Sequence, residues 1–116
     1  MAYVDPKTVV SPKANWSLIK VLRFGDRDEK GEDNASLAVG NWDSFDDKGP
    51  RPVFAMRWNG SGKDTPGVGN PQSRGLPTWF IVPDWMHEAI FNSGLIPEAD
   101  MPFVTSFFSS SPAVRN

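Results

Sequence analysis

The clearest hydrophobic pattern in the chain lies at residues 51–59, where side chains alternate in size and polarity at every second position. A period of two places alternate side chains on opposite faces of a β-strand. The bulky apolar face consists of Phe54, Met56 and Trp58. The smaller face, which ends in a cation, consists of Val53, Ala55 and Arg57. We therefore expect the bulky face, Trp58 included, to form the core and the smaller face to be available for binding.

Three further segments are predicted to be strands, because they are rich in β-branched and aromatic residues and end at turn-forming residues. They are residues 16–24, 35–42 and 78–82. Residues 60–75 contain several glycines and two prolines. We expect this segment to be a loop without regular structure that is more mobile than the strands around it.

A single amphipathic helix is predicted after the last strand. Pro83 suits a first helical position, and Asp84 places a negative charge in the first turn. Gly94 is typical of a left-handed helix stop and Pro97 prevents continuation, so the helix should have about three turns. The residues that recur at helical spacing are Trp85, Met86, Ala89, Ile90 and Ser93.

These elements predict one α+β domain, a four-stranded antiparallel sheet followed by a C-terminal helix. We divide the chain into an N-terminal arm (1–15), a sheet-plus-helix domain (16–96) and a Phe- and Ser-rich C-terminal tail (97–116). The arm has Pro-Lys pairs, which favour extended, solvated and mobile backbone. The tail is apolar enough to dock, either on its own domain or on a neighbour. Helix and tail together present more apolar surface than one small sheet can bury, which predicts a homodimer.

Composition narrows the class of protein. The absence of cysteine excludes disulfides, thiolate metal sites and cysteine nucleophiles. The sequence shows neither the roughly 18-residue apolar run of a membrane span nor the opening pattern of a secretory signal, so we expect a cytoplasmic protein. The net charge of −2 is a mild argument against nucleic acid. However, the acidic residues cluster at 26–33 and 43–47, whereas Lys20, Arg23 and Arg57 lie inside predicted strands.

Motifs for catalysis or metal binding are weak. His87 is the only histidine and has no accompanying partner pattern, so a surface or capping role is the better interpretation. Residues 26–31 resemble the start of a calcium-binding loop, but Lys30 stands at a ligand position. Residues 60–63 resemble part of a phosphate-binding loop, but Arg57 replaces its first glycine. We therefore expect no enzyme activity, no metal and no cofactor.

The smaller face of the predicted strands offers a candidate binding surface. If residues 35–42 pair with residues 51–59, small side chains form a low platform between Trp42 and Arg57. The platform consists of Ala38, Gly40, Val53 and Ala55. An indole can stack on an unpaired base, and a guanidinium can hold the adjoining phosphate. The alternative is that the tail or a second subunit covers this face, with Trp42 simply packed.

Three motifs resemble the single-stranded-DNA-binding domain of transcriptional positive cofactor four and its small bacterial relatives. The motifs are Asn41-Trp42, Pro52-Val53-Phe54-Ala55-Met56-Arg57-Trp58 and Arg74-Gly75-Leu76-Pro77-Thr78-Trp79. The resemblance covers about residues 16–94. It implies a curved antiparallel sheet, dimerisation assisted by the helix, and sequence-tolerant binding of single strands along the sheet. Departures from the family pattern include Ala55 in place of an acidic residue and Arg74 in place of a lysine.

We therefore predict a non-enzymatic protein that binds single-stranded DNA or RNA and has a role in transcription regulation. The expected contact residues are Trp42, Arg57, Arg74, Lys20 and Arg23. Trp58 matches the family motif, but alternation places it on the core face, so we expect a structural role for it. Two alternatives stay open. One is a protein-interaction module or small-ligand-binding dimer without nucleic-acid activity, and the other is an enzyme that uses a cleft between subunits.

Overall fold

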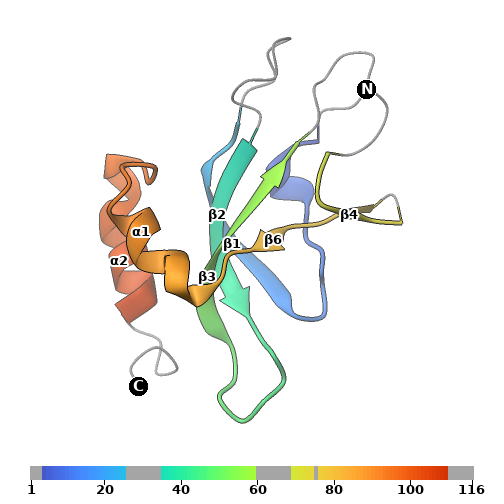
Figure 1. Cartoon of the computed structure of the whole chain (residues 1–116), viewed down its shortest axis with the longest axis horizontal. Helices are drawn as coiled ribbons and strands as arrows, with labels where there is room; N and C mark the ends of the chain where they lie inside the picture. The colour runs from blue at the N-terminus through green and yellow to red at the C-terminus, as the bar shows by residue number, and fades with distance from the viewer. Residues whose placement is uncertain (1–3, 26–34, 60–68, 75, 110–116) are drawn as a thin grey trace.

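The centre of the fold is a four-stranded antiparallel sheet in the order β1-β2-β3-β6 (Figure 1). The computed structural model describes residues 4–25, 35–59, 69–74 and 76–109. The strands of the sheet are β1 (Trp16–Arg23), β2 (Ala35–Trp42), β3 (Arg51–Trp58) and β6 (Phe80–Ile81). A separate two-stranded ribbon consists of β4 (Gln72–Ser73) and β5 (Leu76–Pro77). The predicted α+β class, with an antiparallel sheet and a C-terminal helix, is confirmed.

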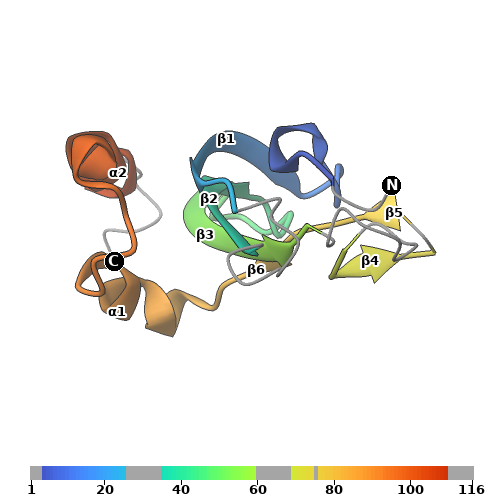
Figure 2. The same ribbon diagram turned by 90° about the horizontal axis from the view of Figure 1, so that it is seen from above.

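The helical segments lie on two sides of this sheet (Figure 2). One side carries what we call the helical layer: η2 (Asp84–Met86), α1 (His87–Phe91), η3 (Glu98–Asp100) and α2 (Met101–Ser109). The other side carries the N-terminal segment, which contains the short turn η1 (Pro6–Thr8), and the β4–β5 ribbon lies beyond it. The sheet is therefore the middle of three layers.

The pairing of the strands is longest at the centre of the sheet. β2 and β3 pair without interruption from Ala35↔Trp58 to Trp42↔Arg51. β6 pairs only with the later part of β3, through Ile81 and Phe80. The last residues of β3 therefore have a well-paired backbone, although the helical layer does not extend over them.

Both faces of β2 and of β3 up to Ala55 are largely buried, so the expectation of one open face is wrong. On the helical side, the core includes Val39, Phe54, Val82, Ile90, Val104 and Phe108. On the opposite side, the core consists of Val9, Trp16, Val21, Ala38, Val53, Ala55 and Trp79. The proposed platform belongs to this second core, and Ala38, Val53 and Ala55 are each 0% exposed. The N-terminal segment and Trp79 cover the platform. The alternative prediction was that the tail or a second subunit would cover it.

The described part of the N-terminal arm packs on the sheet and does not extend into solvent. Val9 is 1% exposed, and its carbonyl accepts a 2.6 Å hydrogen bond from Trp79 Nε1. The backbone N–H of Val4 donates to the carbonyl of Asn59 at 2.7 Å. Gly40 allows close contact on this face, because a Cβ there would lie 2.5 Å from the Trp16 ring. The Pro-Lys pairs favoured solvated backbone, but the two valines anchor the segment.

The Phe-rich segment after Pro97 packs on the chain's own sheet. Phe108 of α2 stacks on Phe54, with ring centroids 4.7 Å apart, and Val104 is fully buried. The preceding helix begins with η2 and ends at Phe91 in α1, so it is shorter than predicted. Its buried side does not include Trp85, which is 80% exposed.

Part of the segment expected to be a mobile loop, residues 60–68 and 75, lies outside the described residues. The described remainder contains strand β4, which pairs with β5. Regular structure therefore occurs within a segment that was expected to have none.

Truncation of a core aromatic residue in α2 tests whether this helix is part of the folded core. Phe108→Ala should lower the free energy of unfolding by about 3–5 kcal/mol, as expected for a buried aromatic side chain. Phe103→Ala is the matched control on the same helix, because Phe103 is 43% exposed, and it should cost about 1 kcal/mol or less. Chemical denaturation measures both, and equal losses would contradict the packing of α2 on the sheet.

Candidate nucleic-acid interface

Arg57, predicted to lie on an open face, is buried inside the fold and only 2% exposed. Its Nε donates to Asn59 Oδ1 at 3.0 Å, and its Nη1 donates to the carbonyl of Thr78 at 2.6 Å and to that of Pro71 at 3.4 Å. The guanidinium thus joins the end of β3 to the residues on both sides of the β4–β5 ribbon. Desolvation by burial lowers the pKa of Arg57 from its usual value.

Asn59 extends these contacts to the ends of two more strands. Its Nδ2 donates to Ser36 Oγ at 2.6 Å and to the carbonyl of Phe24 at 3.0 Å, and it is 0% exposed. Ser36 Oγ itself donates to the same carbonyl at 2.6 Å. Close approach also needs Gly69, where a Cβ would lie 2.6 Å from Arg57 Nη2. Arg57, Asn59 and Ser36, which we call the polar network, therefore fix one end of the sheet.

Three large apolar side chains are exposed at the same end of the sheet. Trp58 is 52% exposed, Phe80 is 54% exposed and Met56 is 38% exposed. They line a groove of about 550 Å³, which we call the aromatic groove. Its lining residues are Ala35, Met56, Arg57, Trp58, Asn70, Pro71 and Phe80. A surface of this kind can take flat, apolar groups such as nucleic-acid bases or the side chains of a protein.

The prediction that Met56 and Trp58 belong to the core is wrong. Alternation places them correctly on the same face as Phe54, but α1 and α2 cover only the part of that face around Phe54 and Val39. Phe80 was missed as a binding candidate. The sequence did contain a signal for Phe80. Alternation within residues 78–82 places its side chain on the opposite face of the strand from Trp79, which is buried.

Backbone pairing brings the ribbon segment to the edge of the aromatic groove. The N–H of Trp58 donates to the carbonyl of Asn70 at 2.6 Å, and the N–H of Asn70 donates back at 2.9 Å. The Arg57 hydrogen bonds to Pro71 and Thr78 hold the following residues. The side of the groove formed by Asn70 and Pro71 is therefore fixed by the same contacts that fix β3.

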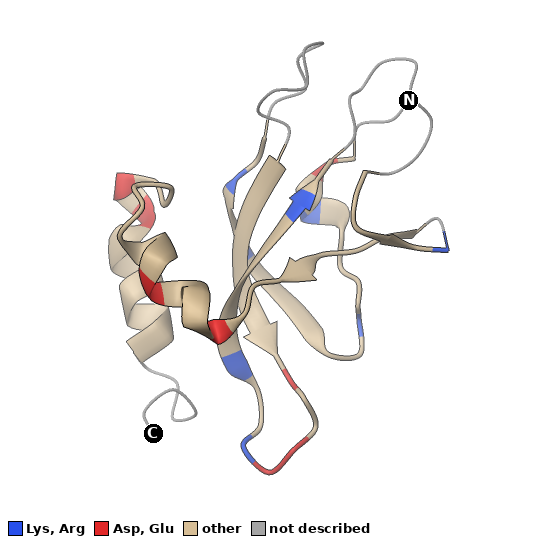
Figure 3. Cartoon of the chain, viewed as in Figure 1, with Lys and Arg blue, Asp and Glu red and all other residues tan. Residues whose placement is uncertain are grey.

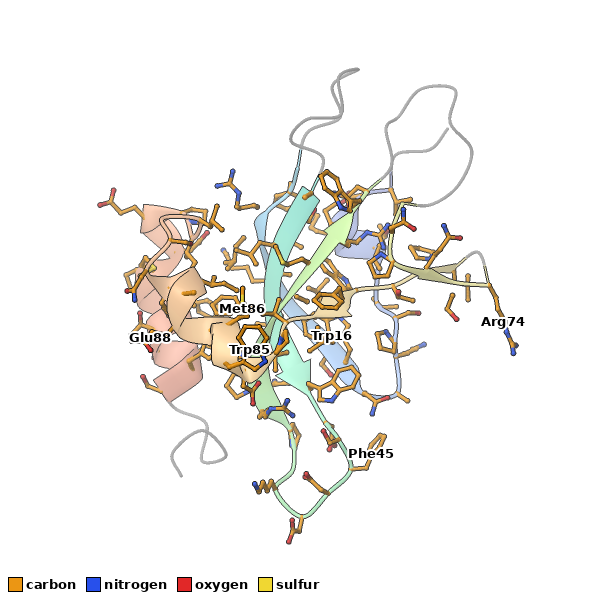
Figure 4. All side chains as sticks on the ribbon, viewed as in Figure 1. Trp16, Phe45, Arg74, Trp85, Met86 and Glu88 are labelled. Atoms are coloured by element: carbon orange, nitrogen blue, oxygen red, sulfur yellow. The ribbon has the colours of Figure 1, made fainter. Side chains whose placement is uncertain are left out.

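The other four predicted contact residues lie outside the aromatic groove. Trp42 is half-buried and packs against the core that contains the N-terminal segment. Lys20 forms an ion pair of 3.3 Å with Asp100, and Arg23 is exposed at the end of β1. Arg74 is exposed at the tip of the ribbon, away from the helical layer (Figure 4). Their role in binding stays a prediction.

The helical layer has only acidic charges of its own, although cations of the sheet border it (Figure 3). Residues 76–109, which contain the helical layer, have no Lys or Arg. Their acidic residues are Asp84, Glu88, Glu98 and Asp100. Among the exposed cations, Lys7, Lys13 and Arg74 lie on the N-terminal segment and the ribbon. Arg23 of β1 instead donates to the carbonyl of Leu95 at 3.4 Å, beside the helical layer, where Lys20 also pairs with Asp100. A polyanion should therefore avoid the helical layer and approach the side that carries the ribbon.

His87 is packed among aromatic rings and has little access to solvent. Its ring meets Phe54 and Phe108 edge-on, with centroids 5.4 and 5.2 Å away. Its Nε2 is buried without a hydrogen-bond partner and lies 3.7 Å from Asp84 Oδ1. Burial lowers the pKa of His87, and the Asp84 carboxylate opposes that shift. This environment favours a neutral packing residue.

Neither a metal centre nor a membrane span is found in the part of the chain that the structure describes. Within those residues, no group of three or more His, Cys, Asp or Glu side chains could hold a metal ion. Among the helices formed by the same residues, none has both the length and the apolar character needed to cross a bilayer.

Comparison with known proteins finds no matching family model, no matching curated protein and no matching solved structure. The resemblance to the positive cofactor four domain depends on the three sequence motifs alone and stays a prediction.

Replacement of Arg57 tests the importance of the polar network. Arg57→Met should lower the free energy of unfolding by about 2 kcal/mol, because it leaves the part-buried carbonyl of Thr78 and the buried amide oxygen of Asn59 without this donor. Arg74→Met, the control at an exposed arginine, should change it by about 0.5 kcal/mol or less. Urea denaturation measures both variants. A stable Arg57→Met protein would show that the network does not hold the fold.

The stability of the protein should fall as the pH is lowered from about 7 to 5. Because the pKa of His87 is lowered in the folded protein, the unfolded chain binds a proton more readily once the pH falls below the ordinary value of about 6.5. The neutral variant His87→Gln should lose less stability across this interval. Denaturation curves at several pH values provide the measurement, and an identical pH dependence in parent and variant would contradict the assignment.

Proposed function

We propose that the protein binds single-stranded nucleic acid in the aromatic groove. The observation that carries this proposal is the exposure of Trp58 and Phe80, which line one groove at the end of the sheet. Base–aromatic stacking contributes about 1–3 kcal/mol per base and accepts any base, because every base has a flat π-face. This surface replaces the buried platform as the proposed contact region.

The geometry of the groove supports stacking of a small number of bases. Met56 and Phe80 are paired across β3 and β6, and Trp58 follows Met56 on the same face. The volume of about 550 Å³ leaves room for one or two bases between these side chains. Since the polar network fixes β3 and the ribbon, the groove is formed before the ligand binds and little ordering entropy is lost.

The charges around the groove indicate a binding mode with few phosphate contacts. Arg57 lines the groove but donates to protein carbonyls and to Asn59. Exposed cations outside the groove include Arg74 on the ribbon and Arg23 at the end of β1. Stacking should therefore supply most of the affinity, and binding should depend only weakly on salt.

Alanine substitution separates the proposed stacking residue from the one expected by sequence. Trp58→Ala should weaken binding of an oligo-dT strand by about 1–3 kcal/mol, because a stacking ring is lost. Trp42→Ala is the matched control, because it removes an indole of similar size outside the groove. Fluorescence titration measures both affinities. Parent-like binding by Trp58→Ala, or a loss confined to Trp42→Ala, would contradict the proposal.

The salt dependence of binding tests the contribution of the ribbon. The plot of log affinity against log salt should have a shallow slope, of magnitude about 0.7–1.4 for one or two phosphate contacts. Arg74→Ala should reduce that magnitude by about 0.7, and Lys48→Ala, on the acidic β2–β3 loop, should leave it unchanged. A steep slope that survives Arg74→Ala would place the phosphate contacts elsewhere.

Homodimerisation through the same groove is a second candidate, favoured by its apolar lining. Exposed patches of large apolar side chains commonly mark subunit interfaces. If Met56, Trp58 and Phe80 pack against a second copy, light scattering should give the mass of a dimer, and Met56→Lys should give a monomer. An oligo-dT strand would then compete with the dimer contact. A monomeric mass for the parent protein would exclude this candidate and leave the groove free for nucleic acid.

A further inference from the structure

A second cleft lies in the helical layer, on a surface that the proposed nucleic-acid binding does not use. It measures about 600 Å³ and lies where the start of β3 meets η2, α1 and the end of α2. Its lining residues are Arg51, Pro52, Asp84, His87, Glu88, Phe91 and Phe108. We call it the helix cleft. Its apolar floor is formed by a proline and two phenylalanine rings, so it can take an apolar or aromatic-stacking group.

The carboxylates at the cleft are not equivalent. Asp84 is paired with Arg51, whose Nε lies 3.1 Å from Asp84 Oδ2. Glu88, one helical turn later, is exposed, and its carboxylate makes no ion pair or hydrogen bond within the described residues. The cleft therefore has an apolar floor and an unneutralised carboxylate on its edge, where a cation with an apolar stem would fit.

Trp85 adds an aromatic ring beside this carboxylate. At 80% exposure it is the most exposed of the large hydrophobic side chains in the described residues. Residues three apart are neighbours on a helix surface, so the η2–α1 segment places Trp85 next to Glu88, at the rim of the cleft and outside its lining residues. An exposed indole next to a carboxylate is a suitable environment for a guanidinium, which stacks on the ring and pairs with the acid.

We propose that the helix cleft docks an arginine-bearing basic segment of a partner protein. Charge complementarity favours a basic partner, because residues 76–109 contain no Lys or Arg (Figure 3) and the Glu88 carboxylate at the cleft is unpaired within the described chain, whereas Arg51 neutralises Asp84 and Lys20 pairs with Asp100. The same charges repel a nucleic-acid strand, and a strongly acidic peptide would be repelled as well. The protein would thus hold a polyanion at the aromatic groove and a basic segment at the helix cleft.

Fluorescence anisotropy with labelled hexa-arginine, at low ionic strength, tests this proposal on the full chain. Hexa-arginine should bind, and hexa-glutamate should not. Glu88→Lys should weaken hexa-arginine binding by roughly tenfold, because it places a like charge at the cleft. Trp85→Ala should weaken it by about three- to five-fold through loss of the cation–π contact, with no change in net charge.

Glu98→Lys is the matched control for general attraction. It changes the net charge as much as Glu88→Lys does, but Glu98 lies in η3 and does not line the cleft. Its effect should be at most about twofold, as for an exposed charge away from the contact. Equal weakening by the two lysine variants would overturn the proposal in favour of diffuse electrostatics. Parent-like affinity of Trp85→Ala, or no binding of hexa-arginine, would overturn it too.

Discussion

The buried guanidinium of Arg57 holds the part of the fold on which the candidate site depends. Its N–H groups donate to carbonyls on both sides of the β4–β5 ribbon and so connect the ribbon to β3. Asn59 extends these hydrogen bonds to the ends of β1 and β2. A buried charge is costly unless its donors are satisfied, so such a network persists only in one arrangement. That arrangement places Asn70 and Pro71 beside Trp58 and gives the aromatic groove two fixed sides.

Most of the surface of the central strands is buried on both faces, so the few aromatic residues that stay exposed there mark a candidate binding site. The N-terminal segment and Trp79 cover one face, and α1 and α2 cover most of the other. Together they use most of the large apolar side chains of the described chain. Trp58, Phe80 and Met56 lie beyond the end of the helical layer, on a well-paired part of the sheet. Their exposure is therefore a property of a folded and ordered surface.

The sequence predicted the strands and the class of fold well, because alternation and turn residues are local signals. β2 was predicted with the observed bounds, and Gly94 has the left-handed φ of +82° expected of a helix stop. The sequence could not show how far a covering layer extends. Phe54 and Trp58 share a face, yet only Phe54 lies under α2.

Sequence patterns also could not predict whether each candidate side chain is buried or exposed. An arginine at the end of a strand is usually exposed, and the burial of Arg57 requires acceptors from residues 59, 71 and 78 that come together only in the fold. The burial of Val9 could not be predicted either. A single valine in an arm that contains Pro and Lys gives no sign in the sequence that it packs near Trp79.

The aromatic groove contains Trp58, and the helix cleft has Trp85 beside it. The tryptophan signals can therefore show directly whether single strands bind in the aromatic groove. The five tryptophans give five indole N–H signals in a ¹H–¹⁵N spectrum of the labelled protein. Trp16 and Trp79 are buried, Trp42 is half-buried, and Trp58 and Trp85 are exposed in different places. On addition of oligo-dT, the account predicts that the Trp58 signal shifts most and that the Trp85 signal stays in place. A shift of the Trp42 or Trp85 signal without a shift of the Trp58 signal would contradict the claim that the aromatic groove binds single strands.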